Sequence, residues 1–234
     1  MNNAIIMASG LGTRMRPLTD TTPKPLIKVG NKPMVESVIE GLLKRNTQKI
    51  AVVVGYLSEQ FNYLPQKYSN VSLIKNKDYQ TINNISSIYY AREMLSEGPC
   101  FICEADLYVS DPSIFEVDLK ESCYYGKMVK GFSDDWVFET GADGYITRVG
   151  KQGTDLFNMV GVSYFDKNDA ATLKVAIEKG YGIPGYENKF WDDIVNENLD
   201  KLKLKVHPVE AGQIVEIDTV AELEIVNRQF AENH

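Results

Sequence analysis

The sequence predicts a single α/β domain with a mixed, mostly parallel central sheet. Short apolar runs alternate with longer segments whose apolar residues recur at helical spacing, and this alternation is typical of β–α–β units. The length of 234 residues suits one large domain, and no internal repeat or linker-like segment divides the chain. Hydrophobic residues make up 44% of the sequence, which is enough to fill a globular core.

The first 120 residues carry the stronger β–α–β pattern. Residues 4–7 form an apolar run that predicts the first strand. Pro33 to Arg45 predicts a helix, because its apolar residues recur at helical spacing. The other elements expected here are strands at Ile50–Val54, Val71–Ile74 and Cys100–Cys103 and a helix from about Asn84 to Leu95.

After Lys120 the pattern changes to short strands separated by turn residues such as Gly141. These strands should add antiparallel pairs and a lid-like region to the parallel part of the sheet. The expected elements are strands at Tyr124–Val129, Val137–Thr140, Tyr145–Val149 and Met159–Phe165 and helices at about Asn168–Lys179, Phe190–Leu199 and Val220–Phe230.

Charge and cysteine content limit the partners and the compartment. The 25 basic and 32 acidic residues give a net charge of −7 without a basic run, which argues against nucleic acid as a partner. The apolar run at residues 4–7 is too short for a signal peptide or a transmembrane helix, so we expect no membrane insertion. Cys100, Cys103 and Cys123 form no even disulfide framework, which favours core thiols and a reducing, cytoplasmic compartment.

A glycine-rich segment with several cations follows the first strand directly. Gly10 and Gly12 allow the backbone to approach a ligand closely, and Arg14 adds positive charge where phosphates would lie. Lys24 follows ten residues later between two prolines, which hold the backbone extended. Met15 stands where the dinucleotide-binding fingerprint needs its third glycine, and the P-loop motif is absent. The segment therefore predicts a triphosphate site of another type, made of Ala8, Ser9, Gly10, Leu11, Gly12, Thr13, Arg14 and Lys24.

The stretch from Ala4 to Leu26 resembles the N-terminal signature of the sugar-nucleotide pyrophosphorylase family of nucleotidyltransferases. The resemblance implies a Rossmann-like three-layer nucleotidyltransferase (nucleotide-diphospho-sugar transferase) fold. It also implies that the loop wraps a triphosphate, that Arg14 stabilises pyrophosphate, and that Lys24 binds the phosphates during transfer. Ser9 departs from the family, which more often has alanine or glycine there.

Acidic residues close two predicted strands. Glu104-Ala105-Asp106 follows one strand, and Val215-Glu216-Ile217-Asp218 forms the end of another. Ligands of open α/β sheets lie beyond the carboxyl ends of strands, so both acids could meet over the nucleotide and hold Mg²⁺. Asp218 could instead cap the helix that follows it. The resemblance favours Asp106 and Asp218 as the metal ligands, with Glu104 and Glu216 as weaker neighbours.

These groups suit attack by a substrate phosphate on the α-phosphorus of a nucleoside triphosphate, with pyrophosphate leaving in line. The nucleophile is already anionic, so no catalytic base is needed. Catalysis then depends on positioning and on neutralising charge. We expect residues 1–234 to form one domain, in which about residues 1–120 bind the nucleotide and about residues 121–234 bind the second substrate.

The nucleotide base should be recognised in the first half. The candidates are Gly55 and Tyr56, in a turn after a strand, and the segment Tyr79-Gln80-Thr81-Ile82-Asn83-Asn84, above all Thr81, Asn83 and Asn84, whose side chains donate and accept hydrogen bonds. For one of the two asparagines, helix capping is about as good an explanation.

A second, closer resemblance covers nearly the whole chain. The sequence is similar to bacterial CTP:phosphocholine cytidylyltransferases, and this resemblance implies CTP and phosphocholine as substrates. Two alternatives for the second substrate stay open, namely 2-aminoethylphosphonate and a sugar 1-phosphate. The residues that carry the resemblance are Asn83-Asn84, Glu104-Ala105-Asp106, Trp136, Gly161-Val162-Ser163-Tyr164, Phe190-Trp191-Asp192-Asp193 and Glu216-Ile217-Asp218.

Aromatic and acidic residues of the second half give physical support for a cationic substrate. A quaternary ammonium has no N–H to donate, so aromatic faces and nearby negative charge bind it. The candidates are Trp136, Tyr186, Glu187, Trp191 and Asp192. Trp191 shares a helix face with apolar residues and is also explained as a core residue, and Asp192 is also explained as the start of that helix.

Two other classes of protein remain to be separated from this hypothesis. Glu104-Ala105-Asp106 resembles the D-x-D metal motif of glycosyltransferases, but a diphosphate-sugar donor does not require the glycine-rich loop or Lys24. A non-catalytic nucleotide-binding regulator could have lost Arg14 and Lys24, which are present here together with both acids. A homodimer is left open as an assembly.

Overall fold

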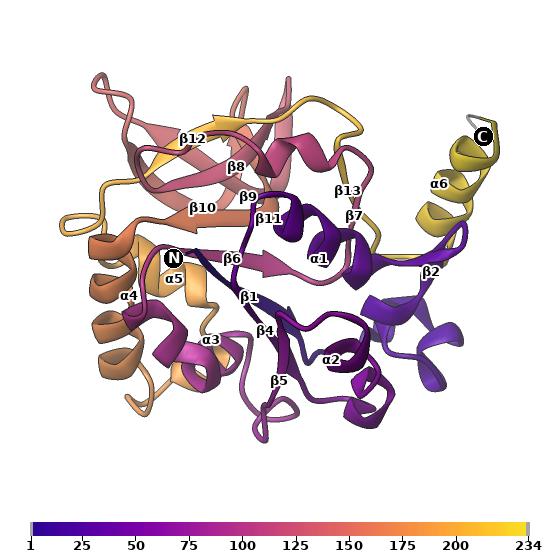
Figure 1. The fold of residues 1–234 in the computed structure, drawn as a ribbon. Helices are drawn as coiled ribbons and strands as arrows, with labels where there is room; N and C mark the ends of the chain where they lie inside the picture. The colour runs from indigo at the N-terminus through magenta and orange to yellow at the C-terminus, as the bar shows by residue number, and fades with distance from the viewer. Residues whose placement is uncertain (1, 233–234) are drawn as a thin grey trace.

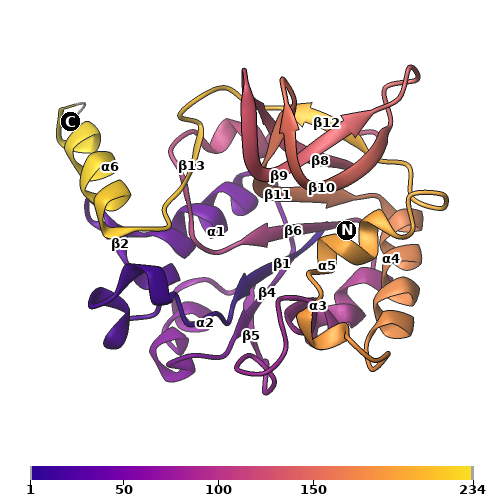
Figure 2. The same cartoon turned by 180° about the vertical axis from the view of Figure 1, so that it is seen from behind.

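The computed structural model of the protein describes residues 2–232, and Figures 1 and 2 show it from opposite sides. At its centre β1 (Asn3–Ala8) pairs in parallel with β4 (Lys49–Val54) and with β6 (Cys100–Glu104), and β4 pairs in parallel with β5 (Val71–Lys75). Nearly continuous apolar runs form these strands because both faces of the sheet are covered. The predicted parallel part of the sheet is confirmed.

Antiparallel strands extend this sheet to nine strands. β11 (Phe157–Phe165) pairs with β6, β8 (Cys123–Met128) and β9 (Phe132–Thr140), and β9 pairs with β10 (Ile146–Thr154). β9 and β10 are both longer than expected. In β9, Ser133-Asp134-Asp135 concealed the strand, because aspartate is depleted in strands. The last strand, β12 (Lys205–Pro208), pairs in parallel with β8.

Helices cover both faces of the sheet and give the three layers that the resemblance implied. α1 (Met34–Lys44) and α2 (Leu64–Lys67) pack on the face to which Ala4 and Ile6 of β1 point. On the face of Ile5, the covering helices are α3 (Ile85–Ala91), α4 (Lys167–Gly180) and α5 (Trp191–Asn196). Short 3-10 helices lie at Thr13–Met15, Leu18–Asp20, Lys24–Leu26, Ser58–Phe61, Arg92–Ser96, Pro112–Phe115 and Tyr186–Asn188.

A small substructure lies beyond the carboxyl end of β6 (Figure 1). β7 (Leu107–Val109) pairs antiparallel with β13 (Ile214–Glu216), and β2 (Lys28–Val29) pairs with β3 (Lys32–Pro33). α6 (Val220–Glu232) follows β13 and projects beside β2 (Figure 1). The strand before Asp218 therefore lies outside the central sheet, which differs from the expectation that both acidic segments end strands of that sheet.

Candidate active site

The loop after β1 is shaped by close contacts on one side and open space on the other. Gly12 has φ of 62°, and a Cβ there would lie 2.9 Å from the Cβ of Lys24, so glycine is required twice over. The Thr19 hydroxyl donates a hydrogen bond to the Gly12 carbonyl at 2.9 Å. A Cβ added to Gly10 would meet nothing within 4 Å, so this backbone is open to a ligand.

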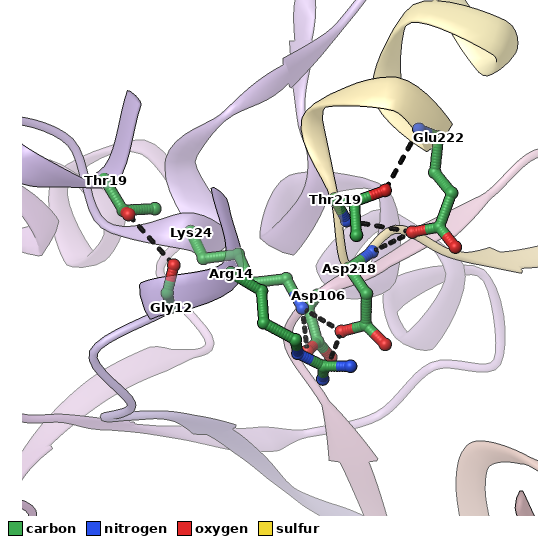
Figure 3. A network of polar contacts seen from close by, with 8 residues as sticks. All are labelled: Gly12, Arg14, Thr19, Lys24, Asp106, Asp218, Thr219 and Glu222. Atoms are coloured by element: carbon green, nitrogen blue, oxygen red, sulfur yellow. Dashed lines mark hydrogen bonds and ion pairs between the residues drawn. The ribbon is translucent and has the colours of Figure 1, made fainter. Parts of the chain in front are cut away.

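Lys24 is the most deeply placed cation of the site. Its side chain is 8% exposed, and its Nζ donates to Asp106 and to Asp218, each at 2.6 Å (Figure 3). Burial disfavours the charged lysine, but its ion pairs and hydrogen bonds with Asp106 and Asp218 outweigh burial and raise its pKa. The two acids, far apart in sequence, thus meet at one ammonium.

A helix start positions Asp218. Glu222 accepts hydrogen bonds from the backbone N–H groups of Asp218 and Thr219, and the Thr219 hydroxyl accepts one from the N–H of Glu222 (Figure 3). This is a capping box, in which Thr219 is the capping residue. The Asp218 carboxylate is therefore free to turn to the site, where Arg14 donates to it at 2.7 Å.

These groups surround a cavity of about 290 Å³. The predicted loop, both predicted cations and both predicted acids contribute to it, and the Arg14 side chain is 68% exposed at its mouth. Cationic groups and a bare backbone in one open cavity are suited to bind phosphates. The residues that line it are Met7, Ala8, Gly10, Gly12, Thr13, Arg14, Lys24, Pro25, Asp106 and Asp218.

A second cavity, of about 240 Å³, adjoins the first at Gly10 and Asp106. Asn83 and Asn84, two of the residues expected to recognise the base, line it, but Thr81 is exposed and does not. Tyr79 and Ile82, from the same expected segment, line it as well, whereas Met7, Ser86 and Ser87 were not identified from the sequence. Ser9 also lines it, and its hydroxyl lies 2.8 Å from that of Ser87, so serine at this family-atypical position joins the loop to α3.

Gly55 and Tyr56 contact the loop and line neither of these two cavities. A Cβ on Gly55 would lie 2.6 Å from the Tyr79 ring and 2.8 Å from the Ser9 carbonyl oxygen. The Tyr56 backbone N–H donates to that carbonyl at 3.1 Å, and its hydroxyl donates to the Thr19 carbonyl at 2.8 Å. In the structure these two residues therefore support the loop through backbone and hydroxyl contacts and do not line the cavity expected to bind the base.

A third cavity, of about 590 Å³, opens from the acids into the second half of the chain. The rings of Trp136 and Phe190 stand 5.4 Å apart at 70°, and the Lys151 ammonium lies 5.9 Å and 5.4 Å from their centres. Acidic groups dominate the rest of the wall, which comprises Glu104, Asp106, Asp134, Asp135, Asp192, Glu216 and Asp218, with Arg14, Asn84, Met159 and Gly161.

Burial perturbs several of these acids. Asp192 is 2% exposed, and burial raises its pKa to about 7 although the Tyr124 hydroxyl donates to it at 2.9 Å. Oxygen atoms of Glu104, Asp106 and Glu216 lie within 4.8 Å of one another. Burial and this crowding raise the pKa of Glu104 well above its usual value and that of Glu216 to about 8. Such a wall gains stability when a cation enters.

Three predicted substrate residues lie elsewhere. Trp191 is 3% exposed and stacks on Tyr124 in the core, so the assignment to substrate is corrected and the core explanation holds. Tyr186 packs edge-on against Tyr181 outside the cavity. Glu187 is exposed, and only its backbone carbonyl takes part, accepting a hydrogen bond from Asn83. Phe190, the residue before Trp191, supplies the second ring instead.

Within residues 2–232, none of the helices combines the length and the apolar character needed to cross a membrane.

Comparisons with known proteins agree with this geometry. Residues 3–125, which include the loop, Lys24 and Asp106, match the family model described as nucleotidyl transferase. A 2-aminoethylphosphonate cytidylyltransferase of Lancefieldella rimae is 52% identical over 94% of this chain and 90% of its own. A choline-phosphate cytidylyltransferase of Streptococcus pneumoniae is 35% identical over 93% of each chain.

A solved structure extends the likeness to three dimensions. The CTP:phosphocholine cytidylyltransferase from Streptococcus pneumoniae superposes with a TM-score of 0.89 at 33% identity, covering 98% of this chain and 99% of that one. The fold, the loop with its two cations and the match to the family model all indicate the same family. The chain belongs to the nucleotidyl transferase family and is a nucleotidyltransferase.

Proposed function

We propose that this protein transfers CMP from CTP to 2-aminoethylphosphonate and releases pyrophosphate. The observation that carries the proposal is the wall of the third cavity, where carboxylates outnumber aromatic rings. This cavity adjoins the first one, which we call the phosphate cavity, at Asp106 and Asp218. A relative that is 52% identical over most of both chains bears the name of this activity.

A primary ammonium suits this wall better than a quaternary one. A primary ammonium donates three hydrogen bonds and therefore needs acceptors, which Asp192, Asp135 and Glu216 offer. A trimethylammonium needs several aromatic faces, and the cavity offers the pair of Trp136 and Phe190. We therefore rank 2-aminoethylphosphonate ahead of phosphocholine, which the sequence resemblance favoured.

Phosphocholine remains the second candidate. The perpendicular pair of Trp136 and Phe190 could hold a methylated ammonium in its corner, and the choline-phosphate relative is 35% identical. A sugar 1-phosphate ranks third, because neutral hydrogen-bonding side chains are few among the residues that line the third cavity.

The reaction needs positioning and charge neutralisation more than acid–base chemistry. A phosphonate oxygen forms a bond to the α-phosphorus of CTP, and the bond from that phosphorus to the bridging oxygen of pyrophosphate breaks. The nucleophile is already anionic, so no residue has to remove a proton. Arg14 and Lys24 neutralise the charge that moves to the leaving group, in a cavity open to both substrates.

Asp106 and Asp218 fit a divalent metal ion. Their carboxylates converge on one ammonium at 2.6 Å each, so both can reach a single cation, and their oxygen atoms are the ligands that Mg²⁺ prefers. Bound there, Mg²⁺ would neutralise phosphate charge as a Lewis acid. Lys24 is then free to turn from the acids to the phosphates.

The remaining expectations follow from the same residues. The second cavity is lined within residues 7–106, and we assign the base to it and the nucleotide role to the first half. The second half supplies Trp136, Lys151 and Phe190 for the other substrate. The three cysteines are buried and unpaired, and Cys100 and Cys103 point to opposite faces of β6, which fits a cytoplasmic protein. The homodimer stays a prediction.

A pyrophosphate-release screen tests the proposal. The purified chain is incubated with Mg²⁺, one of CTP, UTP, dTTP, ATP or GTP, and one of 2-aminoethylphosphonate, phosphocholine, phosphoethanolamine or a sugar 1-phosphate. We expect the highest kcat/KM with CTP and 2-aminoethylphosphonate, and a phosphonate–phosphate anhydride in the ³¹P spectrum. A higher kcat/KM with phosphocholine would reverse our ranking. Hydrolysis of UDP-sugars without pyrophosphate release from CTP would favour a glycosyltransferase.

A further inference from the structure

The chain between α4 and α5 joins the two binding sites. This α4–α5 connection, residues 181–190, ends in Phe190 and leads directly to Asp192, and both of these residues line the third cavity. Gly182 and Gly185 have φ of 93° and 92°, in the region that favours glycine, and residues 182–185 are exposed. Its internal hydrogen bonds are those of short turns, such as the bond from the Tyr186 N–H to the Ile183 carbonyl at 2.9 Å, so its bonds to other elements help to set its position.

Its bonds lead to the nucleotide half. The Asn83 backbone N–H donates to the Glu187 carbonyl at 2.8 Å, and the Asn83 side-chain amide donates to the Asn188 carbonyl at 3.3 Å. The Asn84 side-chain oxygen accepts from the Trp191 N–H at 2.9 Å, at the start of α5. Asn83 and Asn84 both line the second cavity, so the wall of the proposed base site is bonded directly to the wall of the substrate site.

Tyr181, at the other end of the α4–α5 connection, is also bonded to the nucleotide half. Its hydroxyl donates to the Asp78 carboxylate at 2.6 Å, and its ring stacks on that of Tyr89 at 3.7 Å. Asp78 directly precedes Tyr79, which lines the second cavity, and its carbonyl accepts a hydrogen bond from the N–H of Ile82, another residue of that wall, at 2.9 Å. The Tyr90 hydroxyl donates to the same Asp78 oxygen at 3.1 Å, but Tyr90 belongs to the nucleotide half.

We infer that Tyr181 and Asp78 are positioning residues that couple nucleotide binding to binding of the second substrate. A base in the second cavity orders residues 78–84, and these residues hold the α4–α5 connection. Phe190 and Asp192 are then in place before the ammonium arrives, so the second ligand pays less ordering entropy than it would alone. The assignment of ligands to the two cavities rests on the proposed function; the hydroxyl–carboxylate contact does not.

The test measures the coupling itself. The full chain is titrated calorimetrically with the α,β-methylene analogue of CTP, with Mg²⁺, in the presence and absence of saturating 2-aminoethylphosphonate. We expect the wild type to bind the analogue about tenfold more tightly with the second ligand present, within the usual range of coupling between sites. Tyr181→Phe should reduce this factor to below about threefold while the affinity for the analogue alone stays unchanged.

Tyr90→Phe is the matched control, because it removes a hydroxyl from the same Asp78 oxygen without touching the connection. It should keep the wild-type factor. Asp78→Asn provides a second variant that lowers the factor, and far-UV circular dichroism checks that all three variants are folded. An unchanged factor in Tyr181→Phe, or an equal loss in Tyr90→Phe, overturns the inference. If the wild type turns over CTP and 2-aminoethylphosphonate but shows no coupling between their binding, the inference is overturned and the proposed function stands. If the wild type does not turn over 2-aminoethylphosphonate, the result counts against the proposed function.

Discussion

The Lys24 ammonium lies 2.6 Å from a carboxylate oxygen of Asp218, a residue 194 positions further along the chain. The same ammonium lies 2.6 Å from Asp106, so one buried cation holds together the end of β6 and the start of α6. A cation between two acids balances their repulsion while phosphates are absent. The contact therefore serves both stability and catalysis, and the first two predictions follow from it.

Replacement of Lys24 should separate these two roles. We expect Lys24→Ala to lower turnover at least a hundredfold, on the order of 3 kcal/mol, because no other buried cation of the described chain lines the phosphate cavity. The variant should also unfold at lower urea concentration, since Asp106 and Asp218 lose their shared partner. Lys28→Ala, at an exposed lysine of β2, is the control for both measurements. Near-normal kcat in a folded Lys24→Ala would remove the lysine from the mechanism.

Asp218→Asn should weaken binding of the metal while keeping the fold. The amide retains one oxygen ligand but loses the charge, so we expect activity to require roughly ten times more Mg²⁺ for half-saturation, comparable to the loss of one good charge interaction. Chelation of the metal should abolish activity in the wild type, and added Mg²⁺ should restore it. Asp200→Asn, at an exposed acid, should leave the Mg²⁺ titration unchanged. If both variants titrate alike, Asp218 is not a ligand.

The sequence predicted the parallel strands and the phosphate loop because both depend on local patterns. Apolar runs mark strands that are buried on both faces, and glycines beside cations mark an anion site. Asp106 follows such a strand directly and was found with it. The strand before Asp218 was expected too, but β7 and its pairing with β13 outside the central sheet were not, because strands of three residues carry too little pattern.

The substrate wall was harder to predict because it depends on contacts between distant segments. Trp191 and Phe190 are adjacent aromatic residues, and nothing local says which of them faces the cavity. The helical spacing of Trp191 with Ile194 and Val195 indicated the core, and this was the better signal. Nothing in the local sequence distinguishes Lys151 from a surface lysine, since its position over Trp136 depends on the pairing of β9 with β10.

The two tryptophans should behave in opposite ways. Trp136→Ala removes one face of the aromatic pair, so we expect substrate affinity to fall about fivefold to thirtyfold while affinity for CTP and the melting temperature stay close to wild type. Trp191→Ala leaves a cavity beside Tyr124 in the core and should cost about 3–5 kcal/mol of the free energy of unfolding. Calorimetric titration and urea unfolding of both variants check this. Loss of stability in Trp136→Ala instead would make that residue structural.

Asp192 should make stability depend on pH. Burial raises its pKa from 3.8 to about 7, so between these values the folded protein holds a proton that the unfolded chain has released. Stability from this group is therefore present below pH 4 and is lost as pH rises to about 7. Asp192→Asn should flatten the slope of the unfolding free energy between pH 5 and 7, relative to wild type and to Asp200→Asn. An identical slope in all three proteins would place the pKa of Asp192 near its ordinary value.

Lys151 should weaken the binding of a simple amine and strengthen the binding of 2-aminoethylphosphonate. Its ammonium lies over the faces of Trp136 and Phe190, where the ammonium of a substrate would bind, and such a contact contributes about 0.5–1 kcal/mol at an exposed site. Ethylamine must displace it, so Lys151→Met should bind ethylamine about twofold to fivefold more tightly. Displaced by 2-aminoethylphosphonate, the lysine is free to pair with the phosphonate, so the same variant should bind this substrate more weakly.

The opposite signs distinguish this role of Lys151 from a general effect on the cavity. A change that merely loosened β10 would weaken both ligands, and a change that merely reduced positive charge near the acids would strengthen both ammonium compounds. Lys127→Met, at an exposed lysine of β8, controls for the loss of one charge from the chain. Competition of both ligands against turnover, measured for the three proteins, decides the matter. If ethylamine and 2-aminoethylphosphonate shift in the same direction in Lys151→Met, the lysine does not alternate between the aromatic pair and the anion.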